Sequence, residues 1–236
     1  MDFIIHIAKI TALMTTFATL DRALLALRFQ RPYYAVHVIH NLGIVSLTWP
    51  DLITSVTRLS ESQSLPINWE AVQFVYALHF YHTALYWRSF RFDDWLHHAL
   101  MIGVALPLGC LVPAGPLMGF SLFFTTGLPG AIGYGALWLE RNGWLSRLRE
   151  KQISQVVNVW LRAPGCVAQG ALTLAVTLSS QLSPAFSLLW WVGILEAALN
   201  VWNGLYFMEQ VVAAATLVRT AAAVQADANN RGPEDD

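Results

Sequence analysis

Long apolar stretches alternate along the chain with short breaks that are polar or rich in proline and glycine. A helix that spans a membrane needs about 20 mostly apolar residues, and the breaks separate seven stretches of roughly that length. The expected spans are residues 3–27, 33–56, 68–87, 93–112, 117–139, 164–182 and 183–219. The pattern therefore predicts an all-α integral membrane protein with about seven transmembrane helices, in one domain over residues 1–220.

Three segments depart from simple apolar spans. Residues 117–139 contain Pro129 and several glycines, which favour a kink or close helix packing. In the segment 146–162, apolar residues recur at helical spacing, which is typical of an amphipathic helix in the membrane interface, with a separate span starting at Pro164. Residues 221–236 form a polar C-terminal tail that has no means of burying itself.

Composition supports a membrane protein. Of the 236 residues 56% are hydrophobic and only 12% are charged, whereas about a quarter are charged in soluble domains. The net charge of −1 gives no basis for nucleic-acid binding. Cys110 and Cys166 both lie in apolar stretches and indicate core residues rather than a disulfide framework.

The positive charges test the proposed layout. With seven spans, the loops after the first, third and fifth helices share a face with the C-terminus. That face carries Arg22, Arg28, Arg31, Arg88, Arg91, Arg141, Arg147, Arg149, Lys151, Arg162, Arg219 and Arg231, and the opposite face carries Arg58 alone. The positive-inside rule makes the basic face cytoplasmic, or the matrix or stromal side of an organelle membrane. The sequence leaves open whether the membrane is that of the endoplasmic reticulum or an organelle inner membrane.

Polar residues inside the apolar stretches gather near this basic face. Counted at about 1.5 Å per residue, six of the seven histidines lie roughly 5 to 15 Å below it. We expect a shared cavity that binds a lipid, with its headgroup near the basic face and its acyl chain deeper among the leucines. The candidate lipid-binding residues are His37, His40, Asn41, His79, His82, Glu196, Asn200 and Asn203. The alternative for each is a satisfied polar residue that bridges neighbouring helices.

The run from Arg88 to His98 brings ionisable residues to the start of the fourth stretch. Asp93 lies four residues before His97 and Asp94 four before His98, so each carboxylate is expected over its own imidazole. Ionisable groups at the end of a membrane helix tend to mark function. The alternative is an interfacial end-cap without a catalytic role.

Four motifs together resemble the TLC-domain family, the membrane fold shared by ceramide synthases and lipid-regulating relatives. They are Asp-Asp-Trp-Leu-His-His at 93–98, Gly-Leu-Pro-Gly at 127–130, Leu-Glu-Arg-Asn-Gly-Trp at 139–144 and Asn-Val-Trp-Asn-Gly-Leu-Tyr-Phe at 200–207. The resemblance covers most of the chain from about Arg31 onward. It implies a TLC-like bundle in which His97 or His98 is a general base for an amine that attacks an acyl-CoA thioester. Arg88 and Arg91 would then bind the CoA phosphates or a lipid headgroup.

The chain departs from the synthase pattern after the two histidines. It has no Asp or Glu between Asp94 and Glu140, where the synthases have paired aspartates on the next helix. Asp93 and Asp94, which precede the histidines, would have to serve as the orienting groups instead. The departure favours a relative that keeps a lipid-holding scaffold without synthase activity.

Three functions follow for the chain. The first is a non-catalytic protein that binds or organises membrane lipids, as an accessory subunit beside other membrane subunits of a larger complex. The second is a lipid N-acyltransferase that uses acyl-CoA as co-substrate and needs no other cofactor. The third is a di-iron hydroxylase with metal among His40, His79, His82, His97 and His98, but such sites need more histidines, so no metal site is predicted.

Overall fold

The computed structural model describes residues 2–112, 115–179 and 187–231, and all regular secondary structure in these ranges is helical. Four of its helices are long and apolar enough to cross a membrane. They are Phe3–Ala26, Gly115–Arg141, Arg147–Leu178 and Leu188–Asn229. The prediction of an all-α integral membrane protein is therefore confirmed.

The helices form seven rods within the described ranges, because several short helices follow one another without a break. Three rods are single helices near the N-terminus, and α10 is a single long helix at the C-terminal end. The bounds are α1 Asp2–Ala26, α2 Pro32–Thr57, α3 Trp69–Tyr86, α4 Phe92–Leu100 with η3 Met101–Ala105 and α5 Leu106–Gly109, α6 Gly115–Leu122 with η4 Phe123–Gly127 and α7 Leu128–Arg141, α8 Arg147–Val157 with η5 Asn158–Arg162 and α9 Ala163–Leu178, and α10 Leu188–Arg231. The 3-10 helices η1 Leu59–Ser64 and η2 Trp87–Ser89 lie in the connections.

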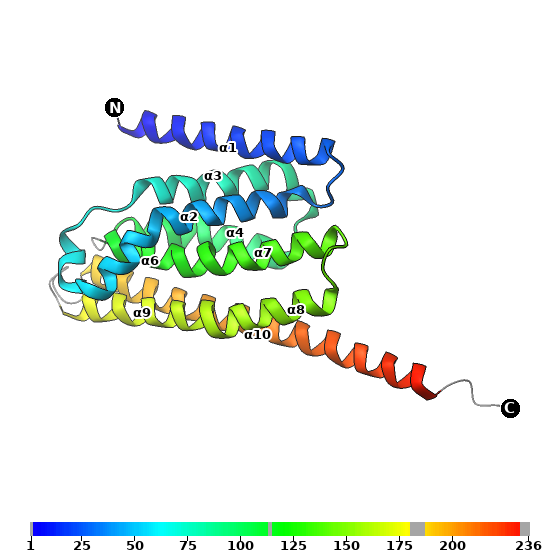
Figure 1. Cartoon of the computed structure of the whole chain (residues 1–236). Coiled ribbons are helices and arrows are strands. Elements are labelled where there is room, and N and C mark those ends of the chain that lie inside the picture. The colour runs from blue at the N-terminus through cyan, green and yellow to red at the C-terminus, as the bar shows by residue number, and fades with distance from the viewer. Residues whose placement is uncertain (1, 113–114, 180–186, 232–236) are drawn as a thin grey trace.

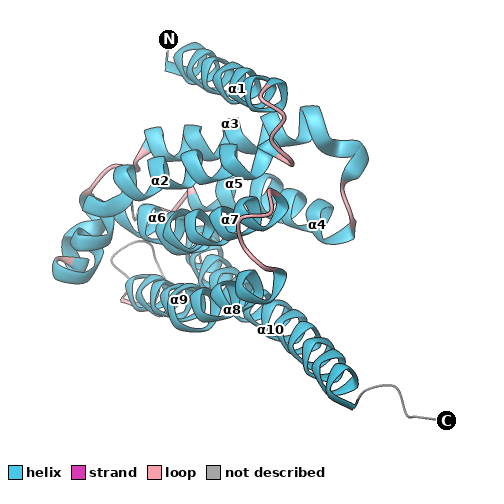
Figure 2. Cartoon of the chain, turned by 45° about the vertical axis from the view of Figure 1, so that its right-hand side comes forward, coloured by secondary structure: helices cyan, strands magenta, loops and turns pink. Residues whose placement is uncertain are grey.

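The rods alternate in direction, and the start of α1 and the end of α10 lie at opposite ends of the bundle (Figures 1 and 2). The connections after α1 and α7 meet at one end, where the Asn142 side chain accepts a hydrogen bond from the Gln30 backbone N–H at 2.9 Å. The connection after α3 and the protruding part of α10 lie at the same end (Figure 1). The arginine-rich loops of the sequence thus gather at one end of the bundle, which we call the basic end.

Three rods contain a π-helical turn, and each turn ends two residues before a proline. η3, η4 and η5 precede Pro107, Pro129 and Pro164 respectively. Proline has no N–H to donate and clashes with the carbonyl of the preceding turn, and a π turn is a common way for a helix to continue past such a defect. η4 lies within residues 117–139, for which a kink or close helix packing is expected.

The structure differs from the sequence analysis over residues 146–162. These residues do not form a separate interfacial helix, because α8, η5 and α9 make one continuous rod from Arg147 to Leu178. Pro164 does not start the rod, since the π turn η5 accommodates it inside the helix. The polar helix α8 therefore continues directly into the apolar helix α9.

The C-terminal helix also runs further than expected. α10 continues past Arg219 to Arg231, through the alanine-rich segment 220–228. Alanine has the highest helix propensity of all residues, which favours helix even where little packs against it. Residues 180–186, where the sixth expected span ends and the seventh begins, and residues 232–236 of the tail lie outside the described residues.

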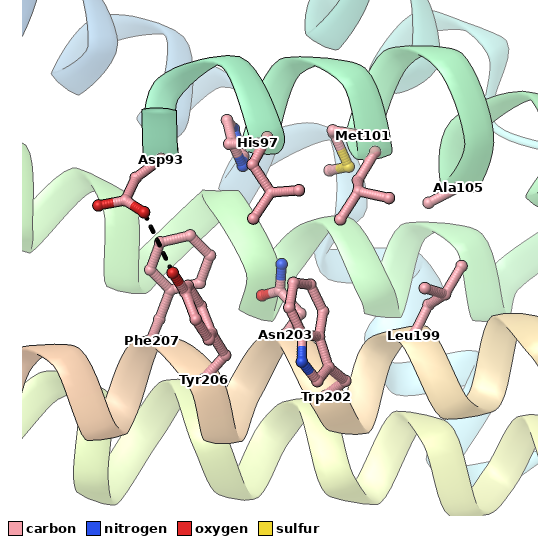
Figure 3. A pocket seen from close by; sticks show the side chains of 11 residues that line it. Asp93, His97, Met101, Ala105, Leu199, Trp202, Asn203, Tyr206 and Phe207 are labelled. Carbon is pink, nitrogen blue, oxygen red and sulfur yellow. Dashed lines mark hydrogen bonds between the residues drawn. The ribbon is translucent and has the colours of Figure 1, made fainter. Parts of the chain in front are cut away.

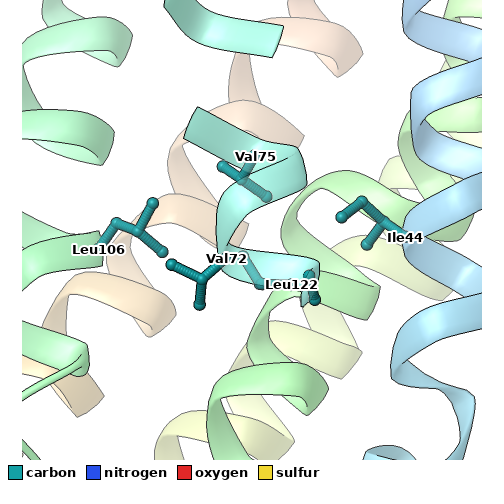
Figure 4. Packing of buried hydrophobic residues seen from close by; sticks show 6 residues of the cluster. Ile44, Val72, Val75, Leu106 and Leu122 are labelled. Carbon is teal, nitrogen blue, oxygen red and sulfur yellow. The ribbon is translucent and has the colours of Figure 1, made fainter. Parts of the chain in front are cut away.

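The apolar core surrounds α3. Ile44, Val72, Val75, Leu106 and Leu122 are at most 2% exposed and pack together from α2, α3, α5 and α6 (Figure 4). Between α2 and α7, Gly130 lies so close to the Asn41 side chain that a Cβ at residue 130 would overlap it. This agrees with the close packing expected of the fifth stretch, and it fixes α7 against α2.

Candidate functional site

A cavity of about 530 Å³ lies toward the basic end of the bundle, between α2, α3, α4, α7, α8 and α10. Its lining combines imidazoles, cations and carboxylates from rods that are far apart in the sequence. Five of the predicted histidines line it, namely His37, His79, His82, His97 and His98. The shared polar cavity that the sequence indicates is therefore present in the structure.

The five imidazoles lie side by side. The rings of His37 and His82 are 4.9 Å apart between centroids, and those of His82 and His98 are 5.4 Å apart. Nε2 of His79 lies 3.2 Å from Nε2 of His97, and the two rings are 5.3 Å apart. The histidines of α2, α3 and α4 that lie near the basic end therefore also face one another.

Backbone carbonyls fix the proton positions on three of these rings. Nδ1 of His37, His79 and His98 lies 2.7, 2.8 and 2.8 Å from the carbonyl oxygens of Tyr33, Val75 and Asp94. A carbonyl can only accept, so each Nδ1 carries the hydrogen and, on a neutral ring, each Nε2 is an acceptor. His97 must then donate from Nε2 to His79.

His98 presents a free acceptor at the cavity. Its Nε2 is buried and has no hydrogen-bond partner among the described residues. A buried acceptor without a partner costs free energy, so a bound group that donates a hydrogen bond would be favoured here.

The two aspartates do not orient the imidazoles. The Asp94 carboxylate accepts the Arg91 backbone N–H at 2.9 Å and so caps the start of α4. The Asp93 carboxylate accepts the hydroxyl hydrogen of Tyr206, at 3.2 Å, from α10. His98 contacts the backbone carbonyl of Asp94 and not its carboxylate. The expected carboxylate–imidazole pairs are therefore not formed, because the helix N-terminus takes one carboxylate and α10 the other.

Four cationic side chains line the same cavity: Arg91, Arg147, Lys151 and Arg162. Arg162 donates to the Asn203 side chain at 3.1 Å and lies over the Phe207 ring at 4.3 Å, which holds its guanidinium at the cavity wall. Lys151 pairs with Glu150 at 3.0 Å. The sequence analysis counted these residues as basic-face charges but did not place Arg147, Lys151 and Arg162 in the site.

Arg147, Lys151 and Arg162 were not predicted to line the site because the sequence was expected to start a new helix at Pro164. A separate interfacial helix would have carried these three cations away from the bundle, whereas the continuous rod brings them over the histidines. Tyr134 was also missed, although its ring lies 4.3 Å from that of His37. Arg147, Lys151 and the nearby Gln155 are spaced four residues apart, which places them on one helix face, and this spacing could have indicated that Arg147 and Lys151 point the same way.

Other predicted residues lie outside the cavity. Arg88 is exposed and its guanidinium lies over the Trp87 ring at 5.3 Å, so Arg91 alone of the predicted arginines lines the cavity. His40 stacks on Phe74 at 5.4 Å and donates from Nδ1 to Asn41 at 2.8 Å. His40 and Asn41 thus contact neighbouring helices, since Asn41 also accepts a hydrogen bond from Thr126 at 3.1 Å. They fit the alternative interpretation only in part, because Nε2 of His40 and Nδ2 of Asn41 are buried without a partner among the described residues.

A narrow apolar seam leads from the cavity toward the middle of the bundle, between the α4–η3–α5 rod and α10 (Figure 3). One wall has Asp93, His97, Met101 and Ala105 at intervals of four residues, so they share one helix face. The facing wall of α10 consists of Leu199, Trp202, Asn203, Tyr206 and Phe207. Asp93, His97, Tyr206 and Phe207 also line the cavity, so the two spaces adjoin each other at these side chains.

The seam continues past Asn203 to the remaining predicted residues. A further small pocket shares Met101, Ala105 and Leu199 with the seam and reaches Glu196 and Asn200. The structure therefore separates the predicted lipid-binding residues into a cavity group at the basic end and a deeper group on α10.

Among the described residues, no group of three or more His, Cys, Asp or Glu side chains is arranged to hold a metal ion. Comparisons with known proteins returned no similarity: no family model, no curated protein and no solved structure matches this chain. The site's chemistry is therefore inferred from its own residues.

Proposed function

We propose that this chain is a non-catalytic membrane protein that binds an amphiphilic lipid, with an anionic headgroup in the histidine cavity and the apolar chain in the seam. One observation carries the proposal: a cavity lined by four cations and five imidazoles adjoins the narrow apolar seam. Few ligands other than an amphiphile match a polar space with an apolar space directly beside it.

A phosphate headgroup suits the cations best. Arg162 is already positioned by Asn203 and Phe207, and guanidinium groups bind phosphate oxygens through paired, charge-assisted hydrogen bonds. The free Nε2 of His98 would accept a hydroxyl hydrogen of the headgroup. A phosphate monoester with a neighbouring hydroxyl, as in lysophosphatidic acid, provides both kinds of group.

The proposal includes seven membrane crossings. α2 and α3 have 26 and 18 residues, which correspond to about 39 and 27 Å and suffice to cross the apolar layer. These rods and α4 carry the histidines of the site, which lower their mean hydropathy although the polar groups face the interior. Seven rods and the order of the four motifs also support membership of the TLC-domain family, with the basic end on the cytoplasmic, matrix or stromal side.

The positions of the aspartates support the proposed absence of catalysis. A general base needs an orienting group and a positioned substrate proton, and in the described residues the carboxylates of Asp93 and Asp94 hydrogen-bond other groups than the imidazoles. One observation favours the acyltransferase as a second candidate: His98 is held by a carbonyl with a free Nε2 acceptor at the cavity. In that case the four cations would bind the phosphates of acyl-CoA.

The proposal is tested by native mass spectrometry of the purified chain in a gentle detergent. Oleoyl lysophosphatidic acid and monooleoylglycerol have the same chain, but only the first carries a phosphate. We expect the phosphate-bearing lipid to bind at least tenfold more tightly, which corresponds to one charge-assisted interaction of about 1.5 kcal/mol or more. Equal binding of the two lipids would contradict the proposal.

Two further measurements separate the alternatives. Incubation with a long-chain base and acyl-CoA should give no N-acylated product, and a product that disappears in His98→Ala would establish the transferase instead. Proteins that copurify in the same detergent test the role as an accessory subunit, which requires membrane subunits that remain bound in stoichiometric amounts.

A further inference from the structure

The deep end of the seam contains a second polar site, which the headgroup cavity does not explain. Glu196 and Gln169 are only 8% and 3% exposed, and both line a small pocket between α5, α6, α9 and α10. Ionisable and polar side chains at this depth are costly and tend to mark function.

The hydrogen bonds within this pocket use its amide donors but not all of its acceptor oxygens. Gln169 Nε2 donates to the Leu117 carbonyl at 3.1 Å and to the Thr173 hydroxyl at 2.9 Å, while Asn200 Nδ2 donates to the Glu196 carbonyl at 3.1 Å. The Ser121 hydroxyl donates to Asn200 Oδ1 at 2.7 Å. The two amide nitrogens thus have partners.

Two oxygens remain without a partner in the described part of the chain: Oε1 of Glu196 and Oε1 of Gln169. Both belong to residues that line the same pocket. Each unsatisfied buried acceptor destabilises the folded chain. An occupant that donates a hydrogen bond would recover this energy, and a purely apolar chain would not.

The position of Glu196 relates the pocket to the lipid. Glu196 lies eleven residues before Phe207 on α10 (207 − 196 = 11), which is about 16 Å along the helix. An extended chain advances about 1.2 Å per bond, judged from ~3.6 Å for a three-bond residue. A chain whose headgroup lies beside Phe207 therefore reaches Glu196 after roughly a dozen bonds.

We infer that the pocket formed by Glu196 and Gln169 recognises a hydroxyl group carried about a dozen carbons along the apolar chain of the bound amphiphile. The inference rests on the proposed function, since it requires the headgroup to lie in the histidine cavity. It assigns the ligand to the class of mid-chain hydroxylated amphiphiles and gives the deep group of polar residues a role in selectivity.

The test compares two lysophosphatidic acids that differ in one atom group, with 12-hydroxystearoyl and stearoyl chains. Native mass spectrometry of the full-length chain measures the ratio of their dissociation constants. We expect the hydroxylated lipid to bind about fivefold more tightly, which is the effect of one net hydrogen bond of roughly 1 kcal/mol. A 2-hydroxystearoyl lipid, whose hydroxyl lies near the headgroup, should show no such preference.

Two variants identify the acceptor. Glu196→Leu removes both acceptor oxygens of the side chain and should abolish the preference without affecting the stearoyl lipid. The matched control is Glu209→Leu, because Glu209 lies on the same helix but is exposed, and it should leave the preference unchanged. The comparison of 12- and 2-hydroxy lipids needs only the wild-type chain, so it remains decisive if Glu196→Leu does not fold.

The outcomes separate the two proposals. If the 12-hydroxy and stearoyl lipids bind equally well, the deep pocket holds water or chain carbons alone and this inference is wrong, while the proposed function stands. If neither phosphate-bearing lipid binds, the headgroup site itself is wrong. A preference that survives in Glu196→Leu would also overturn the assignment of the pocket.

Discussion

The α4–η3–α5 rod has two faces with different surroundings. Leu106 is 2% exposed and packs against α3 in the apolar core, whereas Met101 and Ala105 line the seam opposite α10. The first face is filled by neighbouring side chains, while the second borders a narrow space of about 40 Å³, which the two rods would have to widen to admit a chain. The difference indicates that one face supports the fold and the other serves a ligand, so substitutions on the two faces should affect different measurements.

The largest effect is expected from Leu106→Ala on the packed face. Truncation of a buried leucine costs about 2–5 kcal/mol, because it leaves a cavity that the core cannot fill. Unfolding in mixed micelles of increasing denaturing-detergent content should show this loss. Leu199→Ala in the seam is the control and should cost clearly less stability. Equal losses would show that the two faces are packed alike.

The next effect concerns the cavity at the top of the seam. Arg162→Gln removes a charge that contacts Asn203 and Phe207 at the cavity wall. A hydrogen bond to a charged group contributes about 1.5–3 kcal/mol, so binding of oleoyl lysophosphatidic acid should weaken roughly tenfold to a hundredfold. Titration monitored by native mass spectrometry measures the change.

Arg88→Gln is the matched control for the cavity. Arg88 also lies at the basic end, but its side chain is over Trp87 and outside the cavity. This variant should bind the same lipid as tightly as the wild type. A similar loss in both variants would mean that general attraction to the basic end, and not the cavity, holds the headgroup.

A third substitution narrows the seam itself. Ala105→Phe places a ring between the two rods, so we expect weaker binding of the oleoyl lipid by about tenfold, the equivalent of ~1.4 kcal/mol. Binding of a short hexanoyl analogue, whose chain ends above Ala105, should not change. Ala99→Phe, on an exposed position of α4, is the control. Loss of the short analogue as well would indicate a distorted cavity.

The smallest effect is expected where α4 and α10 meet at the mouth of the seam. Tyr206→Phe removes the 3.2 Å hydrogen bond to the Asp93 carboxylate. Tyr206 is partly exposed, so water can replace the hydroxyl and the loss of stability should stay near or below about 1 kcal/mol. Detergent-induced unfolding checks this value. A loss of stability larger than that of Leu199→Ala would show that the contact between Tyr206 and Asp93 contributes more to the fold than expected.

The fold and the site could be predicted from the sequence to different extents. Apolar stretches, breaks and the one-sided arginines indicated the helical rods, because burial and topology act on every residue of a span. The cavity histidines were found because His79 and His82, like His97 and His98, lie close to the ends of their stretches. The distribution of positive charge correctly grouped the connections at one end of the bundle.

What the sequence did not reveal depends on local backbone geometry and on contacts between distant rods. The π turn η5 lets the helix pass Pro164, and this turn places Arg162 and Lys151 at the site. The carboxylates of Asp93 and Asp94 have the spacing for imidazole contacts, yet a helix cap and Tyr206 take them instead. Neither outcome can be read from spacing within a single helix.

Photo-crosslinking tests most directly whether a lipid lies with its headgroup in the cavity and its chain in the seam. The probe is a lysophosphatidic acid with a diazirine at the end of its acyl chain, and the labelled residues are identified by peptide mass spectrometry. We expect labels on the walls of the seam and deep pocket, on residues such as Met118 of α6 and Leu199 of α10, and loss of these labels in Arg162→Gln. Labels confined to outward-facing residues such as Ile4 of α1 and Val167 of α9, which are 73% and 41% exposed, would contradict the proposed lipid site.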